Sequence, residues 1–69
     1  MNVSNQIKKF RERDGYSQEF LAEKMFVSRQ TISNWENDKS YPDIHNLLIM
    51  CQLFKISPDE LVEDDLKNG

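Results

Sequence analysis

The chain has 69 residues, with nine Lys and Arg against twelve Asp and Glu, and a formal net charge of −3. Its length holds a single domain, its one cysteine excludes an intrachain disulfide, and its longest apolar run, residues 47–51, is too short to span a bilayer. The first residues lack the charged and apolar regions of a signal peptide, so the chain is expected to be cytoplasmic, with no membrane partner.

The acidic excess is unevenly distributed along the chain. Residues 1–41 carry seven basic and six acidic side chains, whereas residues 42–69 carry two basic and six acidic ones. A negative net charge argues against a nucleic-acid partner, but acid concentrated at the carboxyl end can point away from DNA. The near-neutral first part predicts few phosphate contacts and a modest affinity for DNA of arbitrary sequence.

The first predicted helix runs from about Ser4 to Arg13. Val3, Ile7 and Phe10 recur at helical spacing on one face, which is the pattern of a helix that packs on a core. Gly15 follows this helix and is free to adopt the left-handed conformation that ends many helices.

Two further helices each begin with a serine, Ser17 or Ser28, whose hydroxyl can cap the first turn. Apolar residues flank each cap as a hydrophobic staple: Tyr16 with Leu21, and Val27 with Ile32. On the third helix, Ile32 and Trp35 face inward. Its outward face carries hydrogen-bonding side chains that are unusual on a plain solvated surface: Arg29, Gln30, Ser33, Asn34 and Asn37.

The fourth predicted helix follows Pro42, has Asp43 as its N-cap and runs to about Lys55. Its apolar residues recur at three- and four-residue steps, which predicts the central core helix: Ile44, Leu47, Leu48, Cys51 and Phe54. The fifth helix opens with the capping box Ser57-Pro58-Asp59-Glu60. The pattern predicts an all-α fold, a compact five-helix bundle over residues 1–63 with a frayed tail at residues 64–69.

The segment from Gln18 to Asn37 bears most directly on function. Two helices joined by about three residues cross steeply, which places the second helix on the surface with its start projecting. The major groove of B-DNA accepts one such helix, where arginine pairs with guanine and glutamine or asparagine pairs with adenine. Arg29, Gln30 and Asn34 have this chemistry. Helix starts suit phosphate contacts, and three polar residues lie there: Ser17, Gln18 and Ser28.

This segment resembles the Cro/phage-repressor type of helix-turn-helix, often called the XRE family. The matching residues are Ser17-Gln18-x-x-Leu21-Ala22, Val27-Ser28-Arg29-x-x-Ile32-Ser33-x-Trp35-Glu36-Asn37, Lys39 to Pro42, Leu47, Phe54 and Ile56-Ser57-x-x-Glu60-Leu61. The resemblance covers nearly the whole chain. It implies a lambda-repressor-like fold and homodimers that bind double-stranded DNA at a pseudo-palindromic operator.

The resemblance also implies roles for individual residues. Base edges are read by Arg29, Gln30 and Asn34, with Ser33 as a further candidate. The DNA backbone is contacted by Gln18, which also braces the recognition helix, and by Ser28, Asn37 and Lys39. Arg11 and Glu36 match a largely buried ion pair that joins the first helix to the third.

Two residues, Phe26 and Asp38, stand where the family usually has glycine. If the backbone at Phe26 requires a positive φ, a bulky residue is strained there, so either the turn is shifted or packing of Phe26 offsets the strain. Asp38 places a negative charge near the expected phosphate path, which lowers the expected affinity.

These observations favour a sequence-specific DNA-binding transcriptional regulator, acting as a repressor that occludes a promoter. The expected dimer surface lies near the last two helices, at Phe54, Leu61, Val62 or Leu66. The alternative is a protein-interaction module, an adaptor or antitoxin component, that keeps the fold with weak or lost DNA affinity.

An enzyme is not expected because no catalytic arrangement is visible. His45 and Cys51 alone cannot form a metal site, and no cofactor is expected.

Overall fold

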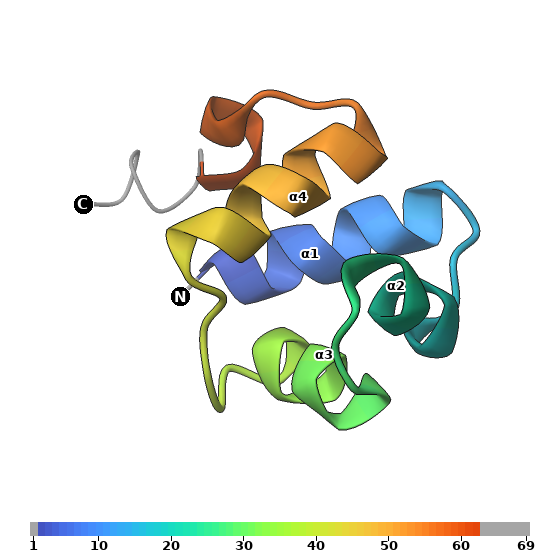
Figure 1. Cartoon of the computed structure of the whole chain (residues 1–69). Coiled ribbons are helices and arrows are strands. Elements are labelled where there is room, and N and C mark those ends of the chain that lie inside the picture. Colours follow the sequence, from blue (N-terminus) through green and yellow to red (C-terminus); the bar gives the residue numbers. More distant parts are fainter. Residues whose placement is uncertain (1, 63–69) are drawn as a thin grey trace.

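The computed structural model describes residues 2–62, which form a bundle of helices (Figure 1). The four longer helices are α1 (Asn2–Arg13), α2 (Gln18–Met25), α3 (Arg29–Glu36) and α4 (Ile44–Phe54). A last helical stretch covers residues 58–62. In Figure 1, α1 crosses the middle of the bundle, with α4 and residues 58–62 above it and α2 and α3 below. The predicted all-α bundle is confirmed, and the tail predicted at residues 64–69 lies outside the described residues.

Each helix after α1 begins at the cap that the sequence predicts. A cap oxygen accepts the N–H of the residue three positions later, at 3.0 Å for Ser17, 3.1 Å for Ser28, 2.9 Å for Asp43 and 3.4 Å for Ser57. Such a bond satisfies a first-turn N–H that has no partner inside the helix, and contributes about 1 kcal/mol. Capping thus sets where α2 and α3 start.

The ends of the four longer helices share one geometry. A residue with positive φ follows each helix: Gly15 (73°), Phe26 (57°), Asp38 (63°) and Lys55 (58°). The next N–H then bonds back to a carbonyl five residues earlier, as in the Schellman motif: Tyr16 to Arg11, Val27 to Ala22, Lys39 to Asn34 and Ile56 to Cys51, at 2.9–3.0 Å. Only the first of these four positions carries glycine, so residue type alone identifies Gly15, whereas the family resemblance draws attention to Phe26 and Asp38.

Phe26 shows how the chain accommodates the missing glycine of the turn. The turn keeps its left-handed residue, with φ 57°. The Phe26 side chain is 95% exposed, so packing against the protein does not offset the strain. The two explanations offered from the sequence, a shifted turn and compensating packing, are therefore both wrong, and the turn retains a strain of about 1 kcal/mol.

The core is formed by twelve apolar side chains from all five helices: Val3, Ile7, Phe10, Leu21, Ala22, Met25, Ile32, Trp35, Met50, Cys51, Phe54 and Leu61. The prediction for α4 needs correction. Ile44 is 69% exposed and Leu48 is 46% exposed, whereas Met50 is fully buried. Because apolar residues occur on every side of α4, its periodicity could not decide which stripe faces inward.

Two polar contacts tie α1 to the carboxyl-terminal elements. The Gln6 side chain, 7% exposed, donates from Nε2 to the carbonyl of Glu60 at 2.9 Å. Arg13 donates from Nη2 to the carbonyl of Phe54 at 2.7 Å. Among residues 2–62, none of the helices has the length and apolar character needed to cross a membrane.

Candidate nucleic-acid interface

The α2–turn–α3 unit presents α3 at the surface and holds it from behind. Residues 26–28 join the two helices, so the link has the predicted length of three residues. Ile32 is fully buried and Trp35 is 4% exposed, so the inward face of α3 is anchored in the core. The opposite face is therefore fixed in orientation and accessible.

The side chains predicted to read bases lie together on this outward face. Arg29 and Gln30 are exposed, and Ser33 and Asn34 are partly exposed. Gln30 donates from Nε2 to Oδ1 of Asn34 at 3.0 Å, one helical turn along α3. Arginine, glutamine and asparagine on one accessible helix face supply the donors and acceptors that base edges recognise.

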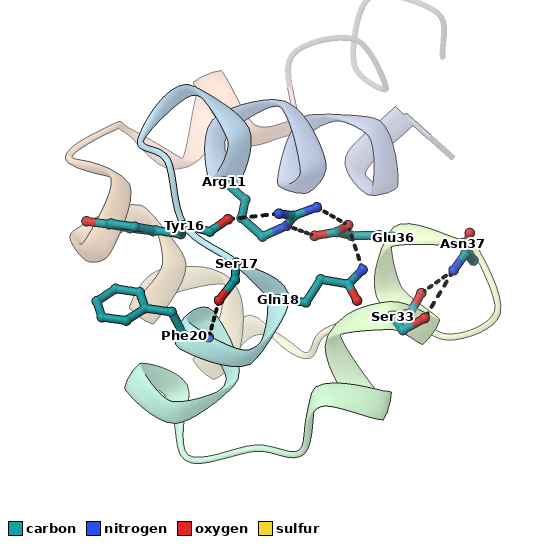
Figure 2. Close-up of polar contacts among 8 residues, drawn as sticks. All are labelled: Arg11, Tyr16, Ser17, Gln18, Phe20, Ser33, Glu36 and Asn37. Carbon is teal, nitrogen blue, oxygen red and sulfur yellow. Dashed lines mark hydrogen bonds and ion pairs between the residues drawn. The ribbon is translucent and has the colours of Figure 1, made fainter.

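Arg11 and Glu36 form a nearly buried ion pair that joins α1 to the end of α3 (Figure 2). Arg11 donates from Nε to Glu36 Oε2 at 2.6 Å and from Nη2 to Oε1 at 3.0 Å, and from Nη1 to the Tyr16 carbonyl at 2.8 Å. The two side chains are 12% and 3% exposed. The hydrogen bond to Glu36 raises the pKa of Arg11 above its usual value.

Gln18, the first residue of α2, belongs to the same network. Its Nε2 donates to Glu36 Oε1 at 3.1 Å, and Figure 2 shows this amide lying between the start of α2 and the end of α3. The amide nitrogen carries a second hydrogen that this bond does not use. Gln18 therefore braces α3 and retains a donor for a further partner.

The other residues predicted to contact the DNA backbone lie in different environments. Ser17, Ser28 and Lys39 are exposed. The two serine oxygens accept cap bonds, which leaves each hydroxyl hydrogen as a possible donor, although Ser28 also shares a hydroxyl contact with Thr31 at 2.9 Å. Asn37 donates from Nδ2 back to the carbonyl and the hydroxyl of Ser33, at 2.9 and 3.2 Å. Those bonds hold the end of α3 and compete with a phosphate contact.

The two acidic residues at the end of α3, Glu36 and Asp38, make polar contacts with α1. Glu36 is paired with Arg11, and Asp38 accepts a hydrogen bond at 3.0 Å from the hydroxyl of Ser4, a residue that is 3% exposed. In Figure 1, residues 58–62, which include Asp59 and Glu60, lie on the opposite side of α1 from α3. Sequence reasoning missed the buried Ser4 because a small polar residue in a helix gives no periodic signal.

The expected dimer surface needs correction. Phe54 is 1% exposed and Leu61 is fully buried, so neither side chain is available to a second chain without unfolding the core. Val62 is partly exposed, and Leu66 lies outside the described residues. The sequence pattern places Phe54 both in the core stripe of the fourth helix and at the dimer surface, and the structure has it in the core. Leu61 lies in a short last helix, where the pattern is too short to distinguish the two faces.

The fold and the accessible face of α3 define a helix-turn-helix domain. The family described as Helix-turn-helix matches residues 7–61. The chain belongs to this helix-turn-helix family, of the XRE type that the residue pattern indicates.

Similar proteins are transcriptional regulators. The chain is 34% identical over 65 residues to HTH-type transcriptional activator BcrR of Enterococcus faecalis, covering 94% of this chain and 32% of the relative. It is equally similar to HTH-type transcriptional regulator ImmR of Bacillus subtilis (strain 168), covering 94% and 51%. The chain thus spans about a third and about half of these relatives.

A solved structure shares the fold of this domain. The P22 c2 repressor protein, in a crystal structure with synthetic operator 9T, matches with a TM-score of 0.79 and 30% identity, over 86% of this chain and 89% of that one. That complex contains the repressor on its operator, so the same fold is compatible with operator binding.

Proposed function

We propose that this chain is a sequence-specific DNA-binding domain of a transcriptional regulator, with α3 as its recognition helix in the major groove. The observation that carries the proposal is the accessible face of α3. There Arg29, Gln30 and Asn34 are presented together, while Ile32, Trp35 and the Arg11–Glu36 pair fix the helix from behind. The P22 c2 repressor, which has this fold, was crystallised with an operator.

Different residues are proposed to contact the base edges and the DNA backbone. The base-edge candidates are Arg29, Gln30, Ser33 and Asn34. The backbone candidates are Ser17, Gln18, Ser28, Asn37 and Lys39. Phosphate contacts fix position and orientation, whereas contacts to base edges carry sequence information. A regulator held on a promoter in this way blocks other proteins from the same DNA, so repression by occlusion is its simplest effect.

Two substitutions separate these roles. Arg29→Ala removes the guanidinium N–H groups that can donate to a base edge. We therefore expect the preference at one base pair to be lost, which corresponds to about 1–3 kcal/mol of discrimination between base pairs. Gln18→Ala removes a backbone donor, so we expect weaker binding to all duplexes. Lys8→Ala changes an exposed residue of α1 and serves as the control. Equal losses on every duplex for Arg29→Ala and Gln18→Ala would contradict this division.

We further propose that the chain binds DNA as a homodimer, with a different contact surface from the one expected. Ile44 and Leu48 lie one turn apart on α4 and are 69% and 46% exposed, whereas Phe54 and Leu61 are buried. Covering such apolar side chains by a second copy is favourable. Replacing both with serine is expected to give a monomer by light scattering and weaker operator binding, and Asn5→Ser, an exposed change on α1, is expected to do neither.

A second candidate function is favoured by the exposed aromatic side chains of α2 and its turn. Phe26 is 95% exposed and Phe20 is 38% exposed, which is a feature of protein-contacting surfaces. Under this alternative the chain is an adaptor or antitoxin component with weak DNA affinity. A titration of mixed duplex DNA at decreasing salt separates the two, because DNA binding strengthens as salt falls. No binding at the lowest salt would favour the alternative.

A further inference from the structure

The turn that follows α3 is tied to the start of α1 through the side chain of Asp38. Asp38 lies two residues after α3 ends, and its Oδ1 accepts the hydroxyl of Ser4 at 3.0 Å. An ionised carboxylate only accepts hydrogen bonds, so the direction of this bond is fixed, with Ser4 as the donor. Ser4 is 3% exposed. The bond therefore joins an exposed turn to a buried residue of the bundle.

The main chain of this turn has a left-handed residue and one long hydrogen bond. Asp38 has a φ of 63°, a conformation that aspartate adopts more readily than most residues other than glycine. The N–H groups of Lys39 and Ser40 both donate to the carbonyl of Asn34, at 2.9 and 3.4 Å. The second distance is long for an N–H···O bond. The Asp38 side chain thus adds a restraint where the main-chain hydrogen bonding becomes weaker.

We propose that Asp38 is a positioning residue, which holds the turn after α3 through its bond to Ser4 so that Lys39 meets the DNA backbone. This inference rests on the proposed function, in which Lys39 is a backbone candidate. Lys39 is exposed and directly follows Asp38, so fixing Asp38 limits the region that the lysine ammonium can reach. A contact made from a fixed attachment point has a lower ordering cost.

The proposal gives a result opposite in sign to that of simple charge repulsion. If Asp38 only repelled phosphates, replacing it with glycine, the usual residue in the family, would strengthen DNA binding. If Asp38 positions Lys39, the same change loses a phosphate contact. One such contact contributes about 0.9 to the slope of log affinity against log salt, and its loss lowers the affinity at 0.1 M salt by about three- to tenfold. Asp38→Gly is therefore expected to weaken binding to all duplexes and to flatten this slope.

The test is a salt titration of mixed duplex DNA with the whole chain and matched variants. Asp38→Gly and Asp38→Asn both remove the charge, but only asparagine keeps a group that pairs with Ser4. It does so in either amide orientation, since a hydroxyl both donates and accepts. Asp38→Asn is expected to bind at least as tightly as the wild type, whereas Asp38→Gly is expected to match Lys39→Ala. The double variant of Asp38→Gly and Lys39→Ala is expected to be no weaker than Lys39→Ala, because coupled residues are not additive.

Ser4→Ala removes the same bond from its other end and leaves the charge of Asp38 in place. Its salt slope is expected to flatten, by no more than that of Asp38→Gly. Asn5→Ala changes the neighbouring exposed residue of α1 and is expected to leave the slope unchanged. Equal affinities and slopes for Asp38→Gly and Asp38→Asn, or tighter binding of Asp38→Gly than of the wild type, would overturn the proposal.

A measurement on the free protein keeps this inference separate from the proposed function. Hydrogen exchange of the Lys39 main-chain N–H reports how often the turn opens. We expect this exchange to be about two- to tenfold faster in Ser4→Ala than in the wild type, which corresponds to the loss of one hydrogen bond, and unchanged in Asn5→Ala. Unchanged exchange in Ser4→Ala would refute the restraint whether or not the chain binds DNA. Absence of DNA binding by the wild type at every salt concentration would refute the proposed function.

Discussion

The Arg11–Glu36 pair provides the strongest test of how α3 is held in place. We consider Glu36→Gln, which keeps the size of the side chain and removes its charge. In the wild type, the carboxylate of Glu36 receives three hydrogen bonds, two from Arg11 and one from Gln18. The variant cannot accept all of these with the same geometry, and it leaves the guanidinium of Arg11 nearly buried without an opposite charge.

The size of the effect follows from this burial. Removing one partner of a buried ion pair costs about 3–5 kcal/mol, because the remaining charge is left uncompensated. A chain of 69 residues has a free energy of unfolding of roughly 3–10 kcal/mol. Glu36→Gln is therefore expected to remove a third or more of the stability, and to lower the melting temperature by roughly 10 °C or more.

Urea unfolding monitored by the fluorescence of Trp35, the single tryptophan of the chain, measures this change directly. Asp14→Asn is the matched control, because Asp14 forms an exposed ion pair with Arg13, and exposed pairs contribute little to stability. If Glu36→Gln lowered the free energy of unfolding as little as Asp14→Asn does, the view that the buried pair anchors α3 would be refuted.

Two further predictions concern backbone strain and thiol chemistry. Phe26→Gly removes an exposed side chain held at a positive φ, so the free energy of unfolding in urea is expected to rise by about 1 kcal/mol; a loss of stability would show that Phe26 makes a stabilising contact. Burial raises the pKa of the Cys51 thiol, so less thiolate is present at a given pH, and alkylation at pH 8 is expected to be slow in the native chain and fast in urea. Equal rates in both conditions would contradict the buried position of Cys51.

The sequence predicted those features that depend on residues close together along the chain. The caps at Ser17, Ser28 and Asp43 follow from local hydrogen bonding between a side chain and the next turn, and the structure has all three. The inward positions of Ile32 and Trp35 follow from an amphipathic pattern with a clear polar side. Local rules also identified the left-handed residue at Gly15, because glycine adopts that conformation without strain.

Other features depend on tertiary context that a linear pattern does not contain. α4 is apolar on several sides, so only its packing against the other helices decides that Met50 is buried and Ile44 is exposed. Phe26 and Lys55 end their helices in a conformation that their side chains disfavour, and no local preference could identify them. The contact between Gln30 and Asn34 joins residues already assigned to the site, but it became visible only with side-chain geometry.

Selection of bound sequences from a random pool of duplex DNA at low salt tests most directly whether the outer face of α3 reads base pairs. With the wild-type chain, we predict enrichment of one motif, arranged as inverted half-sites about 10 bp apart from centre to centre. A pool that stays random after several rounds, with a chain that remains helical by circular dichroism, would contradict the central claim.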